Sequence, residues 1–191
     1  MKRLKTIDDL DFLGKRVLLR ADLNVPIQDG VITDTTRIER IIPTILELQK
    51  EGAQVIVISH FGRPKGRRCP EMSLEPIAEE MGRCLDEVVI FSPNCIGHKA
   101  IEKISAADDQ SIILLENLRF YAEEEENDET FAQQLATLAD IYVNDAFSCA
   151  HRAHASTEAI TRFLPSVAGR LMQSELEALS DALGNPAHPV A

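Results

Sequence analysis

The chain has 191 residues, of which 45% are hydrophobic and 27% charged, a composition typical of globular proteins and unlike collagen, disordered chains or disulfide-rich miniproteins. Acidic residues number 31 against 20 basic ones, and the net charge of −11 argues against broad electrostatic binding to nucleic acid or acidic membranes. The sequence shows neither an apolar run long enough for a membrane helix nor the apolar region of a signal peptide. We therefore expect a cytoplasmic protein.

Five short, nearly continuous apolar runs are the first structural signal, and they predict strands that are buried on both faces. In chain order the runs cover residues 16–21, 54–59, 88–91, 111–115 and 141–143. Apolar residues at helical spacing lie between them, over residues 38–48, 74–85 and 131–138. This alternation predicts an α/β fold, a three-layer, doubly wound (Rossmann-like) domain with a mostly parallel sheet.

Two further features concern the helices. Pro43 lies inside the first helical segment and lacks a backbone donor, so we expect a kink or a restart there. Near the C-terminus, apolar residues at steps of four, three and four predict an amphipathic helix over residues 171–183 that needs a partner. Its apolar positions are Met172, Leu176, Leu179 and Leu183. We expect one domain over residues 1–170, followed by this helix and a connector over residues 171–191.

Polar and charged residues directly follow four of the predicted strands. These residues are Asp22 and Asn24 after the first strand, His60 and Arg63 after the second, Arg119 after the fourth, and His151, Arg152 and His154 after the fifth. Arg37, at the start of the first long helix, is close enough in sequence to join them. Because parallel strands end at the same edge of a sheet, these side chains are expected to gather there.

The residue types in this group indicate the ligand. Guanidinium groups bind phosphate and carboxylate through paired hydrogen bonds, and Asp22 and Asn24 can hydrogen-bond a hydroxyl. A small polyanion that carries a hydroxyl therefore fits. The alternative is that the arginines form ordinary ion pairs with Asp22, Glu116 and Asp145, and the sequence leaves this open for each arginine.

Other chemistries fit the sequence less well. His151 and His154 form H-x-x-H without the glutamate of a zinc protease, and we predict no metal site. Cys149 lies two residues from His151, but neighbours in sequence seldom have the geometry of a thiol nucleophile and its base. The four cysteines form no C-x-x-C pair, and no glycine-rich nucleotide loop occurs. The acidic run over residues 123–126 is interpreted as a solvated loop.

Five segments resemble, in the same order, motifs of the phosphoglycerate kinase family, specifically of its N-terminal half. They are RADLNVPI (20–27), ITDTTRI (32–38), SHFGRPKG (59–66), LLENLRF (114–120) and YVNDAFSCAHRAHAST (142–157). The resemblance implies a glycolytic kinase, a transferase that moves a phosphoryl group reversibly between 1,3-bisphosphoglycerate and ADP. The reaction uses Mg²⁺ and gives 3-phosphoglycerate and ATP.

The resemblance also implies which residues bind the substrate. The positions that match the family's 3-phosphoglycerate site are Asp22, Leu23, Asn24, Arg37, His60, Phe61, Gly62, Arg63, Arg119, His151 and Arg152. In that site Phe61 and Gly62 supply backbone groups, and His154 is expected to take a packing role. Arg37 is the expected catalytic residue, reaching toward the transferring phosphoryl group and stabilising its charge. Departures from the family pattern, at Ala21, Leu23, Phe61, Ser148 and Cys149, alter no charged ligand.

The family's nucleotide and Mg²⁺ sites lie in a second domain, whose phosphate loop would begin beyond Ala191. The sites for ATP or ADP and for Mg²⁺ are therefore expected to be absent from this chain. We expect a fragment or an engineered domain, monomeric, that binds the acid but does not turn it over alone. The alternative hypothesis is a separate anion-binding module, or one that self-associates as a dimer through the exposed apolar helix.

Overall fold

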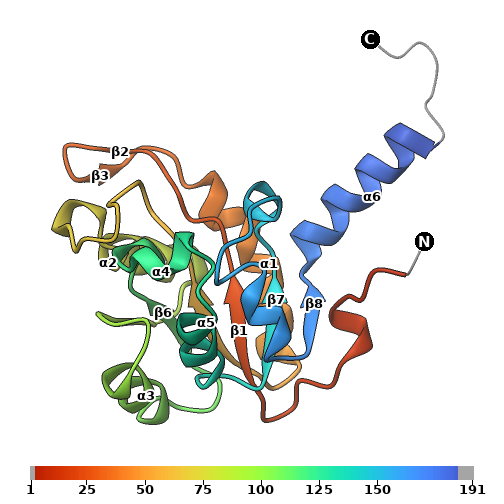
Figure 1. Ribbon diagram of the computed structural model, residues 1–191, viewed down its shortest axis with the longest axis horizontal. Helices are drawn as coiled ribbons and strands as arrows, with labels where there is room; N and C mark the ends of the chain where they lie inside the picture. The colour runs from red at the N-terminus through yellow and green to blue at the C-terminus, as the bar shows by residue number, and fades with distance from the viewer. Residues whose placement is uncertain (1–2, 185–191) are drawn as a thin grey trace.

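The computed structural model describes residues 3–184, and its centre is a six-stranded sheet in which every described pairing is parallel. The strand order is β5-β6-β4-β1-β7-β8, with β1 inside the sheet (Figure 1). These strands are β1 (Arg16–Arg20), β4 (Gln54–Ile58), β5 (Val89–Ser92), β6 (Ile112–Leu115), β7 (Ile141–Asn144) and β8 (Ser166–Ala168). A separate antiparallel hairpin consists of β2 (Ile27–Gln28) and β3 (Val31–Ile32).

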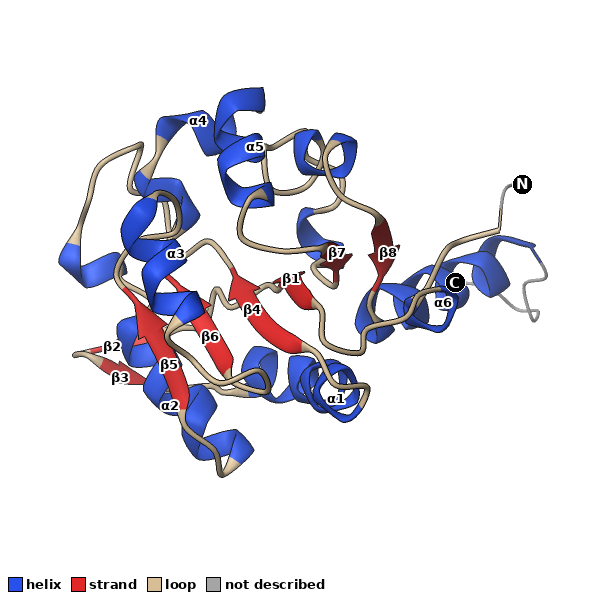
Figure 2. Cartoon of the chain, turned by 90° about the horizontal axis from the view of Figure 1, so that it is seen from below, coloured by secondary structure: helices blue, strands red, loops and turns tan. Residues whose placement is uncertain are grey.

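Helices cover both faces of the sheet. Figure 2 shows α1 and α2 on one face and α3, α4 and α5 on the other. The α-helices are α1 (Thr36–Lys50), α2 (Glu75–Leu85), α3 (His98–Ser105), α4 (Ala122–Glu125), α5 (Glu129–Ala136) and α6 (Arg170–Gly184). Short 3-10 helices are η1 (Ile7–Asp9), η2 (Pro70–Met72), η3 (Leu118–Phe120), η4 (Phe147–Cys149) and η5 (Ala159–Arg162). The predicted three-layer, doubly wound α/β fold is confirmed.

The sheet separates two apolar clusters, and successive residues of β1 alternate between them. Val17 and Leu19 belong to the cluster that includes Ile45 of α1. Leu18 belongs to the cluster that includes Leu135 of α5. All of these side chains are fully buried, and burial of each stabilises the fold by about 1.5–3 kcal/mol. Burial on both faces explains why the strands appear in the sequence as continuous apolar runs.

The sequence predictions of secondary structure are largely confirmed. All five predicted strands occur within a residue or two of the expected bounds, and the three helical segments correspond to α1, α2 and α5. Strand β8, the hairpin and α3 were not predicted. The restart expected at Pro43 is wrong, because α1 is a single helix from Thr36 to Lys50. Buried Ile38, Ile41 and Ile45 fix this helix on the sheet, and their packing outweighs the one backbone hydrogen bond that proline removes.

Helix α6 confirms the amphipathic helix expected over residues 171–183. Met172 is buried against the body of the domain, whereas Leu183 is 81% exposed. The helix extends away from the sheet toward the C-terminal end of the described chain (Figure 1). The connector expected over residues 185–191 lies outside the described residues. Among residues 3–184, no helix combines the length and apolar character needed to cross a lipid bilayer.

The first turn of α6 is fixed to the domain by a buried carboxylate. Asp145, just after β7, accepts hydrogen bonds from Thr44 Oγ1 at 2.6 Å and from the backbone nitrogen of Met172 at 2.8 Å. Burial raises the pKa of Asp145, and these hydrogen bonds act in the opposite direction. Arg170, the first residue of α6, forms ion pairs with Glu47 of α1 and Asp8 of η1. Asp145 and Arg170 together orient α6 on the sheet.

Gly169 makes this junction sterically possible, since a Cβ at this position would lie 2.3 Å from Cγ of Asp145. We expect Gly169→Ala to lower the free energy of unfolding by about 1–3 kcal/mol, because Asp145 must move away from Thr44 and α6. Urea denaturation measures this cost. As a control, the same substitution in an Asp145→Gly background, which removes both the Cγ and the Cβ that a new methyl group would meet, should cost about 1 kcal/mol less. Equal costs in the two backgrounds would contradict the proposed contact.

Candidate functional site

The carboxyl edge of the sheet gathers charged side chains from four strand ends. We call these residues the carboxyl-edge cluster: Arg20, Asp22, Asn24, Arg37, His60, Arg119 and Arg152. Arg20 ends β1, Asp22 and Asn24 follow it, and Arg37 lies in the first turn of α1. His60 follows β4, Arg119 lies in η3 after β6, and Arg152 follows η4 after β7. Parallel strand direction is what brings residues so distant in sequence to the same edge.

Asp22 is the acidic member of the cluster and is already hydrogen-bonded. Its carboxylate forms an ion pair with Arg37 and accepts hydrogen bonds from Ser148 Oγ and from the backbone nitrogen of Asn24. Burial acts to raise the pKa of Asp22, but these hydrogen bonds and the charge of Arg37 outweigh it and the pKa is lowered. The Arg37 side chain remains 47% exposed. Arg37 is therefore accessible to a ligand while Asp22 orients it.

Gly62 connects three loops at the edge through its backbone. Its nitrogen donates to Asn24 Oδ1 at 2.9 Å, and its carbonyl oxygen accepts from Arg119 Nη1 at 2.9 Å. These contacts join the loops that follow β1, β4 and β6. The Asn24 and Arg119 side chains are thus held in fixed relative positions by their hydrogen bonds to the Gly62 backbone. A side chain could not easily take the place of these backbone groups.

His60 is buried and faces several cations. Its Nδ1 lies 2.9 Å from Nη2 of Arg20. Burial, followed by the charges of Arg20 and Arg119, lowers the pKa of His60 to about 3, and Arg152 acts in the same direction. The imidazole is therefore neutral at pH 7. Three guanidinium groups from different strand ends lie near enough to His60 to influence its charge.

A buried acidic residue balances the charge of Arg20. Arg20 Nε donates to Ser156 Oγ at 2.9 Å, and that hydroxyl donates to Glu124 Oε1 at 2.6 Å. Glu124 is fully buried in α4. The interpretation of residues 123–126 as a solvated loop is therefore wrong for its central part, which forms a helical turn with Glu124 directed inward.

Arg119 has the most unusual environment in the cluster. Only 6% of the residue is exposed, and its Nε lies 3.3 Å from Oε1 of Glu125. That contact lacks hydrogen-bond geometry, and Nε is a buried donor with no hydrogen-bond acceptor among the described residues. Burial lowers the pKa of Arg119, partly offset by Glu125. A buried donor without an acceptor, close to other cations, favours an anionic ligand.

Asn117 positions the loop after β4 and Arg119 together. Its Oδ1 accepts from the backbone nitrogens of Phe61 (3.1 Å) and Arg119 (3.0 Å). Its Nδ2 donates to the carbonyl oxygens of Phe61 (2.7 Å) and Met72 (2.9 Å). The side chain is fully buried and uses all four of its hydrogen-bonding positions. Asn117, Arg20, Ser156 and Glu124 were not predicted from the sequence as site residues. The available signal was a charged residue, Arg20, at the end of an apolar run.

The other predicted site residues lie outside the carboxyl-edge cluster as defined above. The Leu23 side chain lies in the core, and its backbone nitrogen donates to Ser59 Oγ. The backbone nitrogens of Phe61 and Gly62 are bonded to Asn117 and Asn24, so in this arrangement they shape the loop. Arg63 and His151 are exposed and form no hydrogen bond or ion pair with the cluster in residues 3–184. His154 is half-buried, 3.8 Å from Glu124, and burial lowers its pKa.

The ion-pair alternative accounts for only part of the cluster. Asp22 does pair with Arg37, as that alternative requires. Glu116 lies 3.6 Å from Arg68 and accepts hydrogen bonds from Ser73 Oγ and the Leu74 nitrogen. Asp145 holds α6, as described above. Across residues 3–184, no carboxylate lies within ion-pair distance of Arg20, Arg63 or Arg152.

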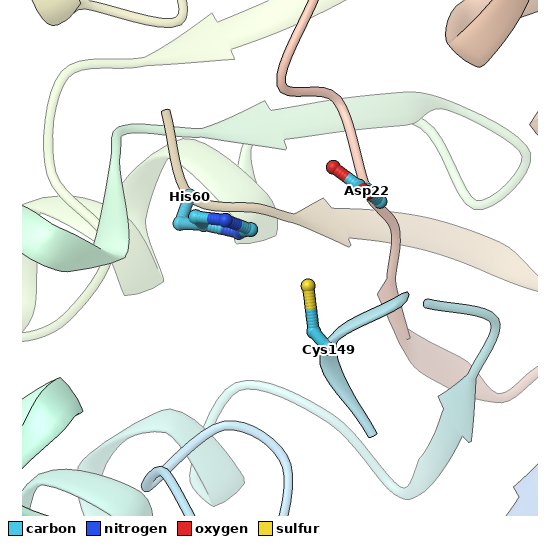
Figure 3. A group of neighbouring side chains, drawn as sticks. All are labelled: Asp22, His60 and Cys149. Atoms are coloured by element: carbon cyan, nitrogen blue, oxygen red, sulfur yellow. The ribbon is translucent and has the colours of Figure 1, made fainter. Parts of the chain in front are cut away.

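Asp22, His60 and Cys149 are grouped in a way that raises the question of a metal. One potential ligand atom from each lies within 4.8 Å of the other two (Figure 3). However, Asp22 is paired with Arg37, and His60 Nδ1 is occupied by Arg20. The surrounding guanidinium groups would repel a divalent cation. The three side chains also offer a single carboxylate, whereas Mg²⁺ prefers several oxygen ligands. The surrounding positive charges favour an anion.

The fold and the cluster define a doubly wound α/β protein with a concentration of positive charge at the carboxyl edge of its sheet. The sequence matches the family model "Phosphoglycerate kinase" over residues 7–191. Phosphoglycerate kinase of Sinorhizobium medicae (strain WSM419) is 58% identical over 187 residues, covering 97% of this chain and 47% of that protein. That of Agrobacterium fabrum (strain C58 / ATCC 33970) is 56% identical over 191 residues, covering 100% of this chain and 48% of that protein. The chain belongs to the phosphoglycerate kinase family.

Solved structures agree with this assignment. Phosphoglycerate kinase from Coxiella burnetii superposes with a TM-score of 0.85 at 39% identity, covering 98% of this chain and 47% of that structure. The enzyme from Pyrococcus horikoshii OT3 gives a TM-score of 0.89 at 35% identity, covering 97% of this chain and 47% of that structure. The chain thus spans about half the length of the relatives it matches.

The buried state of His60 predicts a pH dependence of stability. The unfolded chain binds a proton on this imidazole below about pH 6.5, whereas the native protein does so only near pH 3. The free energy of unfolding therefore falls as the pH drops from 6.5 toward 3. In His60→Gln this loss should be smaller by up to about 1.4 kcal/mol per pH unit. Urea denaturation at pH 7, 6 and 5 measures the difference, and parallel losses in both proteins would contradict it.

Proposed function

We propose that the carboxyl-edge cluster binds 3-phosphoglycerate and 1,3-bisphosphoglycerate, as the substrate-binding half of a phosphoglycerate kinase. The observation that carries the proposal is the buried Nε of Arg119, a donor with no hydrogen-bond acceptor among the described residues, with the charge of Arg152 close to it. Family membership supports the choice of ligand among small anions.

Individual residues are assigned roles by the chemistry of this ligand. Arg119 and Arg152, joined by exposed Arg63 and His151 when their loops move onto the ligand, bind phosphate and carboxylate oxygens. Asp22 and the free amide of Asn24 bind the hydroxyl. Arg37 exchanges its contact with Asp22 for the ligand and stabilises negative charge on the transferring phosphoryl group, the catalytic role proposed for it. Phe61, Gly62 and Leu23 hold the loops that carry these groups.

Phosphoryl transfer forms a bond between a carboxylate oxygen of 3-phosphoglycerate and the terminal phosphorus of ATP, and it breaks the bond from that phosphorus to the bridging oxygen, which leaves with ADP. The phosphoglycerate kinase family in general uses a nucleotide and Mg²⁺, and the grouping of Asp22, His60 and Cys149 does not fit that cation. Residues 1–170 are proposed as the acid-binding domain, with α6 leading toward a nucleotide-binding domain like the unmatched half of the relatives. The chain alone would bind the acid without turning it over.

Isothermal titration calorimetry tests this function. We expect weak, salt-sensitive binding of 3-phosphoglycerate, and an affinity about ten- to a hundredfold lower in Arg119→Ala, because a buried charge-assisted contact contributes about 1.5–3 kcal/mol. Arg83→Ala is the matched control, since Arg83 is exposed on α2 and pairs with Glu80. It should bind like the unaltered protein.

Three results would count against the proposal. Tight binding of MgATP to the chain would contradict the assignment of the site to the acid. Equal affinity for inorganic phosphate and 3-phosphoglycerate would favour the alternative of a general anion-binding module. Unfolding of Arg119→Ala, observed by circular dichroism, would indicate that Arg119 acts through structural ion pairing.

A further inference from the structure

We propose that Arg20 is a positioning residue that holds His60 as a neutral imidazole with its proton on Nε2, so that His60 offers the anion site a hydrogen-bond donor and not a positive charge. The identity of the acceptor rests on the proposed function. The protonation and tautomer of the imidazole do not depend on the proposed function, because they follow from contacts within the protein.

The contact between Arg20 and His60 determines the tautomer. Nη2 of Arg20 lies 2.9 Å from Nδ1 of His60. A guanidinium group has only donors and is not deprotonated in proteins, so Nδ1 must be the acceptor and carry a lone pair. A neutral imidazole then has its proton on Nε2. Protonation of Nδ1 would require this hydrogen bond to break, and both residues are at least 95% buried.

Arg20 cannot easily turn toward a ligand, because all three of its nitrogens are bonded within the protein. Besides His60, it donates to Ser156 Oγ at 2.9 Å and to the carbonyl oxygen of Ala21 at 2.5 Å. Ser156 directs its own proton to Glu124 Oε1, and its backbone nitrogen donates to Glu124 Oε2 at 2.9 Å. Arg20 therefore differs from Arg37, which is partly exposed. Its effect on the site passes through His60.

Four charged groups around His60 act on the same equilibrium: Arg20 of β1, Asp22 of the following loop, Arg119 of η3 and Arg152 after η4. The thiol of Cys149 in η4 lies close to Asp22 and His60. Three cations face one carboxylate, and that carboxylate is paired with Arg37. Figure 3 shows the His60 ring directed toward the space between Asp22 and Cys149. A proton on Nε2 is thus available to a ligand bound there.

A neutral His60 affects how the site attracts anions. Positive charge comes from arginines, which remain charged at all physiological pH values, and His60 adds direction without adding charge. Were His60 a cation, it would increase the repulsion among the guanidinium groups. The neutral donor fixes the ligand while keeping the empty site stable.

Nitrogen NMR of the 191-residue chain, labelled at histidine and free of ligand, tests the inference. We expect the His60 signals to show a pyridine-type Nδ1 and a pyrrole-type Nε2 that do not change from pH 8 to pH 5. His60→Gln assigns the signals. A pyrrole-type Nδ1, or protonation of His60 with a midpoint above pH 5, would overturn the inference.

A pair of variants tests the role of Arg20. Arg20→Met combined with Glu124→Gln removes both buried charges together, and circular dichroism checks that it folds. In this protein His60 should show both tautomers and become protonated at a pH higher by about one unit or more. Glu124→Gln alone keeps Arg20 and should retain the original tautomer. Unchanged His60 signals in the folded double variant would contradict the positioning role.

The two proposals can fail separately. If His60 has the expected tautomer but 3-phosphoglycerate does not bind, the proposed function is wrong and the inference on Arg20 stands. If the acid binds while His60 is in the other tautomer, the proposed function stands and the inference on Arg20 is wrong. Should the double variant not fold, the tautomer of the unaltered chain still decides the inference.

Discussion

The repulsion among guanidinium groups at one edge of the sheet is the constraint on which the site depends. Two unit charges 4 Å apart repel by about 4 kcal/mol near a protein surface, and here several converge. The protein holds them by internal contacts: Arg20 is balanced by Glu124 through Ser156, and Arg119 is fixed through Gly62. The charge that remains unpaired is what a small anion would neutralise. A chain with a net charge of −11 can thus attract anions at this edge of its sheet.

Rigidity of the site comes from residues that do not touch the ligand. Asn117 joins the loop after β4 to Arg119 through four hydrogen bonds, and Glu116 beside it holds the start of α2. Both directly follow β6, which is buried in the sheet. Asp145 plays a comparable part after β7, where it anchors α6. The ends of β6 and β7 therefore carry buried polar residues that fix the loops and helices around the carboxyl-edge cluster.

The gathering of charged residues at the carboxyl edge was predictable from the sequence, but many of the contacts among them were not. Apolar runs followed by Asp22, His60 and Arg119 indicate a common edge because strand direction alone brings them together. The contact between Arg20 and Ser156 joins residues 136 positions apart, and nothing in local spacing encodes it. Glu124 looked solvated because its neighbours in the run are acidic, while its burial depends on tertiary packing. The ligand contacts expected from the family remain predictions for every site residue, Arg63 and His151 included.

The most direct measurement is a crystal structure of the chain grown with 3-phosphoglycerate. The account predicts the acid at the carboxyl edge, bound by Arg119 and Arg152, with Arg37 turned from Asp22 toward it and Arg20 still bonded to Ser156. A ligand bound elsewhere, or an empty edge whose arginines are all paired with carboxylates, would contradict it.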